Sequence, residues 1–332
     1  LVQSGLSSAL LLMGIVLLYG VAGNPALVGA VDDPFAFDQL RSFIALNADN
    51  AYVLGGAMLV LAGLLFKVAA VPFQIWVADV YQGAPTAVTA FLGVASKAAG
   101  FVLLINVLAV PFAPLKSVTL PLLSVLAVAT MLFGNFAALG QRNVKRLMGM
   151  SGIAHAGYML MGVCAAVAGV AWAPTAVYFY LFAYLLASFT LFAVMSIVSG
   201  EDDSLQDISD YAGLLKRDNF LGGVLVVALG SLAGIPPMAG FVAKLLLFIA
   251  AVKAGLYTVL GAALLGVVIS IYYYFGWMRT AVFESASPGA DDEEAEGGPA
   301  PLPQLCFWMR TTLTTLAILT VGMGFWQGFL TL

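Results

Sequence analysis

The feature that most constrains this fold is an apolar stretch with two adjacent prolines in its middle. The segment 221–253, LGGVLVVALGSLAGIPPMAGFVAKLLLFIAAVK, is long enough to cross a bilayer as a helix. Pro236 and Pro237 lack backbone N–H donors and clash with the preceding turn, so we expect the helix to break there. In lipid, the backbone groups freed by a break must be satisfied by protein or by a wet cavity. The stretch therefore predicts a discontinuous membrane helix inside a bundle.

Composition extends this interpretation to the whole chain. Of the 332 residues, 62% are hydrophobic and 9% are charged, whereas soluble domains carry about 25% charged residues. Apolar runs of about 20 residues recur, which predicts an all-α polytopic membrane protein with about nine spans in one transmembrane domain, 1–332. The predicted spans are 6–21, 51–72 with a short irregular continuation to 83, 86–108, 118–139, 147–170, 175–198, 221–253, 257–278 and 305–329.

The ends of the chain and its loops carry further expectations. The chain begins LVQSG, without methionine and almost inside an apolar run, so we expect further helices before Leu1. Residues 284–304 are rich in acid, glycine and proline and are predicted to form a flexible loop. Cys164 and Cys306 lie far apart, without the spacing of a metal or cofactor site, and are expected to be packing residues.

The distribution of basic residues predicts the orientation in the membrane. Loops that alternate along the chain differ in lysine and arginine, and the richer set is expected to face the cytoplasm. The sequence has no basic patch that would suggest binding to nucleic acid. The apolar spans make the lipid bilayer the expected surroundings of the chain. The richer set holds Arg142, Lys145, Arg146, Lys216, Arg217, Arg279 and Arg310, and the poorer set holds Arg41, Lys116 and Lys253.

Three lysines lie within the apolar runs: Lys67, Lys97 and Lys244. No aspartate or glutamate lies at a comparable depth, since all of them fall in loops or at loop edges. An ionisable group inside a membrane is costly and marks a functional site by default. Low dielectric favours the neutral amine, so such lysines could exchange protons near neutral pH. The alternative is that they extend to the interface or serve in packing.

Three further residues bear on this interpretation. Pro72 follows Lys67 by five residues and predicts a second helix break. His155, the only histidine, could be a hydrogen-bonded packing residue or a proton carrier beside the lysines. Asp79 is interpreted as a loop residue or a helix cap.

The motifs resemble one known family. The run FKVAAVPFQIWVADVYQGAPTAVTAFLGVASKAAGF (66–101) is similar to the antiporter-like subunits of respiratory complex I, and most similar to the NADH–quinone oxidoreductase subunit N family, the counterpart of mitochondrial subunit 2. Four further matches follow in the family's order and extend the resemblance over nearly all of the chain: NVKRLMGMSGIAHAGYMLMG, DISDYAGLLKR, LGSLAGIPPMAGFVAK and SIYYYFGWM.

The resemblance implies a fold and a set of roles. It implies a fourteen-helix antiporter-like bundle with two inverted five-helix repeats, of which this chain would hold helices six to fourteen. Lys67 would lie on the first broken helix, Lys97 would be the central lysine, and Lys244 would lie on the second broken helix. His155 would bridge them. The glutamate that the family places on its fifth helix, opposite Lys67, has no match here, and Gln74 and Ala78 replace a common histidine and proline.

The resemblance also implies partners and location. The chain would bind other membrane-arm subunits in a bacterial inner membrane, with Arg142, Lys145 and Arg146 facing the cytoplasm. It would hold no cofactor or metal itself, because NADH, FMN, iron–sulfur clusters and quinone would belong to the rest of the complex. Proton translocation along the lysines is the function implied. The alternatives are a monovalent cation/proton antiporter of the same fold and a scaffold that spaces neighbouring subunits.

Overall fold

The structure is a bundle of helices. The computed structural model describes residues 2–200, 202–284 and 302–325, and six helices in these ranges are long and apolar enough to cross a membrane. A helix satisfies its own backbone hydrogen bonds, which is what apolar segments require in lipid. The six are α1 (Val2–Ala22), the continuous span Thr86–Ala109, α7 (Lys116–Leu139, after a 3₁₀ turn at Ala113–Leu115), α8 (Val144–Ala168), α9 (Ala173–Ser199) and α13 (Tyr257–Phe283).

The three other predicted spans are shorter helices or pairs of them. The pairs are α3 (Ala51–Lys67) with α4 (Trp76–Gly83), and α11 (Asn219–Ala233) with α12 (Ala239–Lys253). Each half is too short to cross a bilayer by itself, because a span needs about 20 residues. The last is α14 (Phe307–Phe325). Short helices occupy the connections: α2 (Phe37–Leu46), a 3₁₀ turn at Ile208–Tyr211, and α10 (Leu214–Arg217).

Both helix breaks lie at the predicted prolines, and side-chain hydroxyls accept hydrogen bonds from backbone N–H groups there. At Pro72, the N–H of Val71 donates to Thr130 Oγ1 of α7 at 3.0 Å. At Pro236 and Pro237, α11 ends on Gly234, and the N–H of Gly240 in α12 donates to Ser231 Oγ of α11 at 3.2 Å. Because protein groups replace water as partners, the interruptions can persist inside a membrane.

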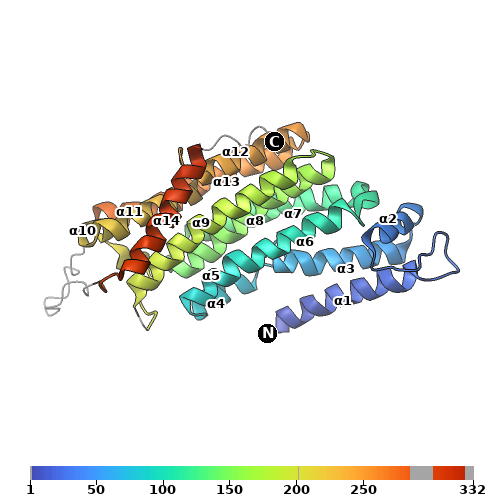
Figure 1. Ribbon diagram of the computed structural model, residues 1–332, viewed down its shortest axis with the longest axis horizontal. Helices are drawn as coiled ribbons and strands as arrows, with labels where there is room; N and C mark the ends of the chain where they lie inside the picture. The colour runs from blue at the N-terminus through green and yellow to red at the C-terminus, as the bar shows by residue number, and fades with distance from the viewer. Residues whose placement is uncertain (1, 201, 285–301, 326–332) are drawn as a thin grey trace.

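Helix α8 lies in the middle of the bundle, among helices that run side by side along its long axis (Figure 1). It contacts α4, α7, α9 and α12 and is buried from Val144 to Ala165 except at Arg146. Gly157 permits the approach to α7, since a Cβ there would lie 2.4 Å from Met131 Cγ. Helices α1 and α3 pack on each other at one edge of the bundle.

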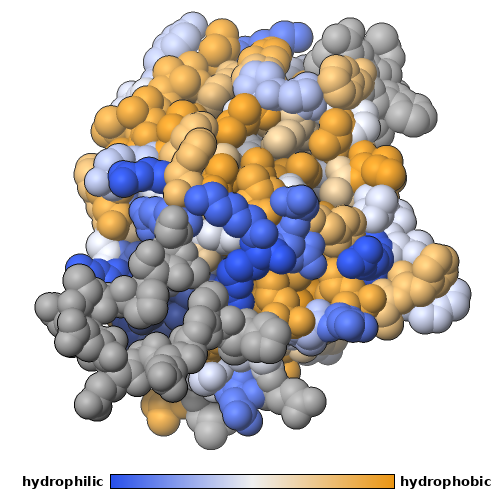
Figure 2. Space-filling model, turned by 90° about the vertical axis from the view of Figure 1, so that its left-hand side faces the viewer, coloured by the Kyte–Doolittle hydropathy of each residue, from blue (hydrophilic) through white to orange (hydrophobic). Residues whose placement is uncertain are grey.

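The surface agrees with a membrane protein. Figure 2 views the end of the bundle where α10 lies, and it shows hydrophilic residues gathered between wide hydrophobic areas. The predicted flexible loop cannot be compared over most of its length, since 285–301 lie outside the described residues. The all-α, membrane-spanning architecture with two discontinuous helices is confirmed.

Candidate functional site

Lys97 is buried in the centre of the bundle. It follows a π-helical turn, Leu92–Ser96, that joins α5 (Thr86–Phe91) to α6 (Lys97–Ala109). A π turn changes the register of a helix and is frequent at functional sites. The side chain is 3% exposed, and its Nζ donates a 2.7 Å hydrogen bond to the carbonyl of Gly152 in α8. A Cβ at Gly152 would lie 3.2 Å from this nitrogen, so the glycine leaves room for the amine.

Lys244 binds the end of a broken helix. The side chain extends from α12 and is 4% exposed, and its Nζ donates to the carbonyls of Leu232 and Ala233 at 2.9 Å and 2.8 Å. These are the last residues of α11, where carbonyls have no partner within the helix. The carbonyl end of a helix also carries a partial negative charge. The break therefore supplies the hydrogen-bond partners of this amine.

His155 lies between the two lysines and has both ring nitrogens engaged. Nδ1 lies 2.7 Å from the hydroxyl of Tyr180, and Nε2 lies 3.2 Å from the hydroxyl of Tyr274. A neutral imidazole donates from one nitrogen and accepts at the other, whereas a tyrosine hydroxyl does both. The arrangement therefore accommodates either tautomer. Both interpretations of His155 from sequence are compatible with it, since the ring is hydrogen-bonded and also adjoins the lysines.

Two tyrosine rings and a small cavity join the histidine to the lysines. Lys97 Nζ lies 5.8 Å from the ring centre of Tyr184, which is 4.9 Å from that of His155. On the other side, Lys244 Nζ lies 5.5 Å from the ring centre of Tyr158, which is 6.0 Å from the histidine. A cavity bordered by His155, Tyr180, Tyr184 and Lys244 has a volume of ≈ 10 Å³, near the lower limit for one water.

Lys67 differs from the other two lysines, because its side chain is exposed in the described chain. It is the last residue of α3, which lies between α1 and α6 (Figure 1). A Cβ at Gly100 would lie 3.2 Å from Lys67 Cγ, so the aliphatic stem runs against α6 one turn from Lys97. Among the described residues, no hydrogen bond or ion pair of its amine joins it to the other lysines.

The basic turn predicted from 142–146 is also different in the structure. Lys145 is not a loop residue but lies in the first turn of α8, with 1% of its side chain exposed. Arg142 is exposed, and Arg146 Nη1 pairs with Asp79 Oδ1 at 3.1 Å. Asp79 lies in the first turn of α4. Hydropathy counts assigned Lys145 to a loop because it borders the span, whereas tertiary contacts place its amine inside.

Sequence reasoning missed the tyrosines of this site. Tyr158, Tyr180, Tyr184 and Tyr274 are all buried, and a fifth, Tyr273, donates to Asn135 Oδ1 at 3.2 Å. Helical spacing contained a signal. Tyr180 and Tyr184 are four residues apart, and His155 and Tyr158 are three apart, so each pair shares one helix face. As for metals, the described residues contain no group of three or more His, Cys, Asp or Glu that could hold an ion.

A family model described as NADH:quinone oxidoreductase/Mrp antiporter, TM matches residues 1–270. The chain belongs to this family. Its curated relatives include NADH-quinone oxidoreductase subunit N 1 of Opitutus terrae, 54% identical over 328 residues, which are 99% of this chain and 64% of the relative. Subunit N 1 of Rhizobium meliloti is 38% identical over 288 residues, 85% of this chain and 56% of the relative. The chain thus spans less than two thirds of these relatives.

Solved structures share the fold. A chain of respiratory complex I from Thermus thermophilus with bound aureothin is 31% identical, with a TM-score of 0.75 over 98% of this chain and 66% of that chain. A chain of the Mrp complex from Dietzia sp. DQ12-45-1b has a TM-score of 0.82 at 24% identity, over 99% of this chain and 64% of that chain. The first supports the family assignment, and the second shows the shared antiporter-like fold.

Proposed function

We propose that this chain is a proton-translocating membrane-arm subunit of a complex I-type NADH–quinone oxidoreductase. The observation that carries the proposal is the buried line from Lys97 through His155 to Lys244, which three different helices build inside one apolar bundle. The relatives named subunit N support the assembly in which the line would work. Its partners would be other membrane-arm subunits and the lipid bilayer.

The geometry supports a relay in which each group has a defined part. Lys97 would pass a proton toward His155 past the hydroxyl of Tyr184. His155 would exchange protons with the hydroxyls of Tyr180 and Tyr274, which bond both of its nitrogens. The cavity beside Lys244 would hold the water that completes the step. The carbonyl end of α11 would stabilise the ammonium form of Lys244 until release.

The remaining roles concern loading and coupling. Lys67, next to the first break, would load the line. This chain would bind no cofactor. Other subunits would hold FMN and the iron–sulfur clusters and would carry out NADH oxidation and quinone reduction. The energy released by these reactions would change the hydration and the charge of the lysines in this chain. The protein would lie in a bacterial inner membrane, with the end that carries Arg142, Lys145 and Arg146 toward the cytoplasm.

The test is Lys97→Ala in the complete enzyme, assayed in inverted membrane vesicles. We expect proton uptake per NADH oxidised to fall by about tenfold or more, because loss of a proton-transfer group typically slows the transfer by about 10²–10⁴-fold. Lys116→Ala is the control, because this lysine is exposed, lies outside the line and donates to the C-terminal carbonyl of α8 at Ala168. Unchanged proton uptake by an assembled Lys97→Ala enzyme would remove the relay and favour the scaffold.

A second candidate is a subunit of a monovalent cation/proton antiporter. The family description names the Mrp antiporter together with the oxidoreductase, which favours keeping it. Copurification separates the two. The oxidoreductase function requires this chain to purify with NADH-oxidising and quinone-reducing subunits, whereas the antiporter requires exchange of a monovalent cation for protons without them.

A further inference from the structure

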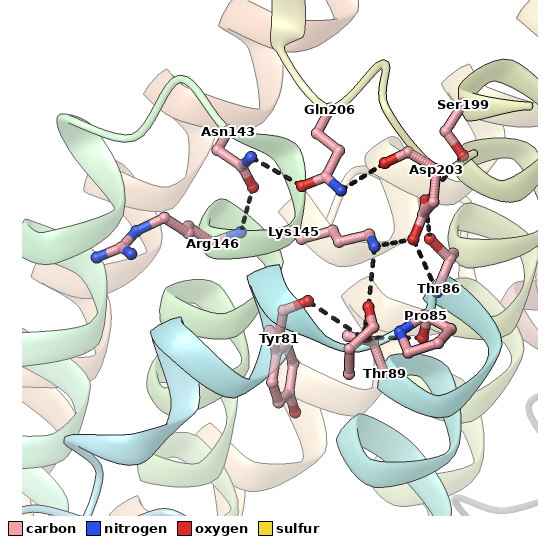
Figure 3. A network of polar contacts seen from close by, with 11 residues as sticks. Tyr81, Pro85, Thr86, Thr89, Asn143, Lys145, Arg146, Ser199, Asp203 and Gln206 are labelled. Carbon is pink, nitrogen blue, oxygen red and sulfur yellow. Dashed lines mark hydrogen bonds and ion pairs between the residues drawn. The ribbon is translucent and has the colours of Figure 1, made fainter.

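One ion pair outside the lysine line joins three distant segments of the chain. Lys145 Nζ of α8 pairs with Asp203 Oδ2, which lies in the connection after α9 (Figure 3). The lysine side chain is 1% exposed and the aspartate side chain is 23% exposed. Such a pair is more shielded from water than ordinary surface pairs, so its hydrogen bonds are stronger and its loss is more costly.

Lys145 also holds the end of the first broken helix. Its Nζ donates to the carbonyl of Ala84 at 3.0 Å, and Ala84 is the residue at which α4 ends. A positive charge at this position complements the partial negative charge of a helix C-terminus. The amine therefore attaches α4, the second half of the helix that carries Lys67, to the start of α8.

Asp203 holds the start of the helix that carries Lys97. Its Oδ1 accepts from the hydroxyl of Thr86 at 2.7 Å, and its Oδ2 accepts from the N–H of Thr86 at 3.2 Å. The residue before this helix is Pro85, which offers no side-chain cap. The carboxylate supplies the missing cap from a distant segment, at the helix end where negative charge is favoured.

The surrounding contacts fix the aspartate in place. Ser199 Oγ, at the end of α9, donates to Asp203 Oδ1 at 3.0 Å, and Gln206 Nε2 donates to the Asp203 carbonyl at 2.6 Å. Gln206 is itself held by Asn143 Nδ2 at 3.1 Å (Figure 3). Partial burial opposes the charged carboxylate, but hydrogen bonds from Lys145, Thr86 and Ser199 and the charge of Lys145 outweigh it and lower the pKa of Asp203.

The same face of α8 touches the Lys97 helix a second time. Lys145 and Gly152 are seven residues apart, which places them on one face about 10 Å apart along the axis. Through Asp203, Lys145 holds Thr86, and the Gly152 carbonyl accepts from Lys97 itself. The span Thr86–Ala109 is therefore attached to α8 at both ends of the segment that contains the π turn.

We propose that Asp203 and Lys145 are positioning residues that hold the α4–α5 junction on α8 and thereby fix where the Lys97 amine lies. They do not carry the proton. Because their effect on proton transfer rests on the function proposed above, the test needs a readout that does not depend on pumping. Lys145 caps the end of α4 and Asp203 caps the start of α5, and these two ends meet at Ala84–Thr86. Loss of the ion pair would therefore remove the caps of both helix ends.

The experiment uses Asp203→Asn and Lys145→Met in the purified complete enzyme. Amide hydrogen exchange is followed at 86–91, and proton uptake per NADH oxidised is followed in vesicles. We expect exchange protection at 86–91 to fall about tenfold, as loss of a charge-assisted hydrogen bond implies, and proton uptake per NADH to fall several-fold. Asp203→Glu keeps the negative charge, so this variant should retain part of the exchange protection at 86–91 and part of the proton uptake.

The matched control is Asp79→Asn. Asp79 and Arg146 form an ion pair between the same helices, α4 and α8, but their side chains are 79% and 33% exposed, so screening leaves the pair weak. We expect neither readout to change in this variant. If Asp203→Asn fails to assemble, Thr86→Val removes one hydrogen bond while keeping the ion pair, and its protection at 86–91 serves the same purpose.

Each outcome decides something. Unchanged exchange at 86–91 in the Asp203 variant, or in Thr86→Val where that variant fails to assemble, overturns the positioning role, whatever the function of the chain. Lower protection with full pumping also overturns it where Lys97→Ala does lose pumping, because the junction then does not control the position of a working amine. Failure of the function itself appears separately, as unchanged pumping in Lys97→Ala with the exchange result intact.

Discussion

At the second broken helix, the amine of Lys244 donates to two carbonyls of α11 and is buried. At the first, Lys67 is the last residue of α3 and is exposed. The two lysines differ in their position relative to the break. Lys244 follows the break, so its side chain can reach back to the free carbonyls of the preceding half. Lys67 precedes the break and belongs to the half whose carbonyls are freed.

The backbone at the two breaks is accordingly satisfied in different ways. At the first, a hydroxyl of a neighbouring helix, Thr130 of α7, accepts from the backbone of Val71. At the second, the groups come from the broken helix itself: Ser231 accepts from Gly240, and Lys244 donates to the carbonyls. At the second break, the lysine amine itself binds the carbonyls that the break frees. At the first break, the described contact of the backbone is with Thr130 and does not involve Lys67.

The largest expected difference is between Lys244→Ala and Lys67→Ala. Losing Lys244 leaves the carbonyls of Leu232 and Ala233 without their donor, at a cost of about 1–3 kcal/mol for a buried polar group left unpaired. Losing the exposed Lys67 should cost less than about 0.5 kcal/mol of stability. Thermal unfolding of the purified enzyme measures this, beside proton uptake in vesicles. Equal shifts in melting temperature would show that the Lys244 contacts do not hold the break.

A smaller difference is expected at the backbone itself. Gly234 has φ +87° and Ala69, near the first break, has φ +62°. Gly234→Ala should destabilise by about 1–2 kcal/mol, because a Cβ is disfavoured in this region and would lie 3.0 Å from Lys244 Cδ. Ala69→Gly relieves the same strain, so its stability should change little or rise.

Denaturant or thermal unfolding of both variants checks the pair. Gly261→Ala on α13 is the control, since a Cβ there would meet no other part of the described chain within 4 Å. A Gly234→Ala enzyme as stable as the wild type would mean that the second break tolerates a shifted Lys244, against the tight coupling described above.

The sequence predicted the breaks better than it predicted their surroundings. Proline chemistry acts within one turn, so Pro72, Pro236 and Pro237 identify the interruptions from local residues alone. Burial of a side chain depends on which helices cover it. The same argument treats Lys67, Lys97 and Lys244 alike, yet helices of the described chain cover only Lys97 and Lys244.

Partners far along the chain explain the other differences. The sequence assigns Asp203 to a loop between spans, yet it pairs with Lys145, 58 residues away. Likewise, Tyr274 meets His155 across 119 residues. Local sequence patterns do not indicate contacts between residues that lie so far apart along the chain. The helical spacing of Tyr180 and Tyr184 could have indicated a shared polar face, but not which helix that face would meet.

The smallest expected difference is between the two side chains that serve the break backbones. Thr130→Val removes the acceptor of the Val71 N–H, a 3.0 Å bond, and should destabilise by about 1 kcal/mol, the usual net value of a hydrogen bond. Ser231→Ala removes a longer bond of 3.2 Å to the Gly240 N–H and should cost about half as much. Thermal unfolding of the complete enzyme compares them. The start of α12 packs closely on α11 here, since a Cβ at Gly240 would lie 1.8 Å from the Ser231 carbonyl oxygen. A larger loss of stability for Ser231→Ala than for Thr130→Val would therefore mean that the second break depends on this contact as well as on Lys244.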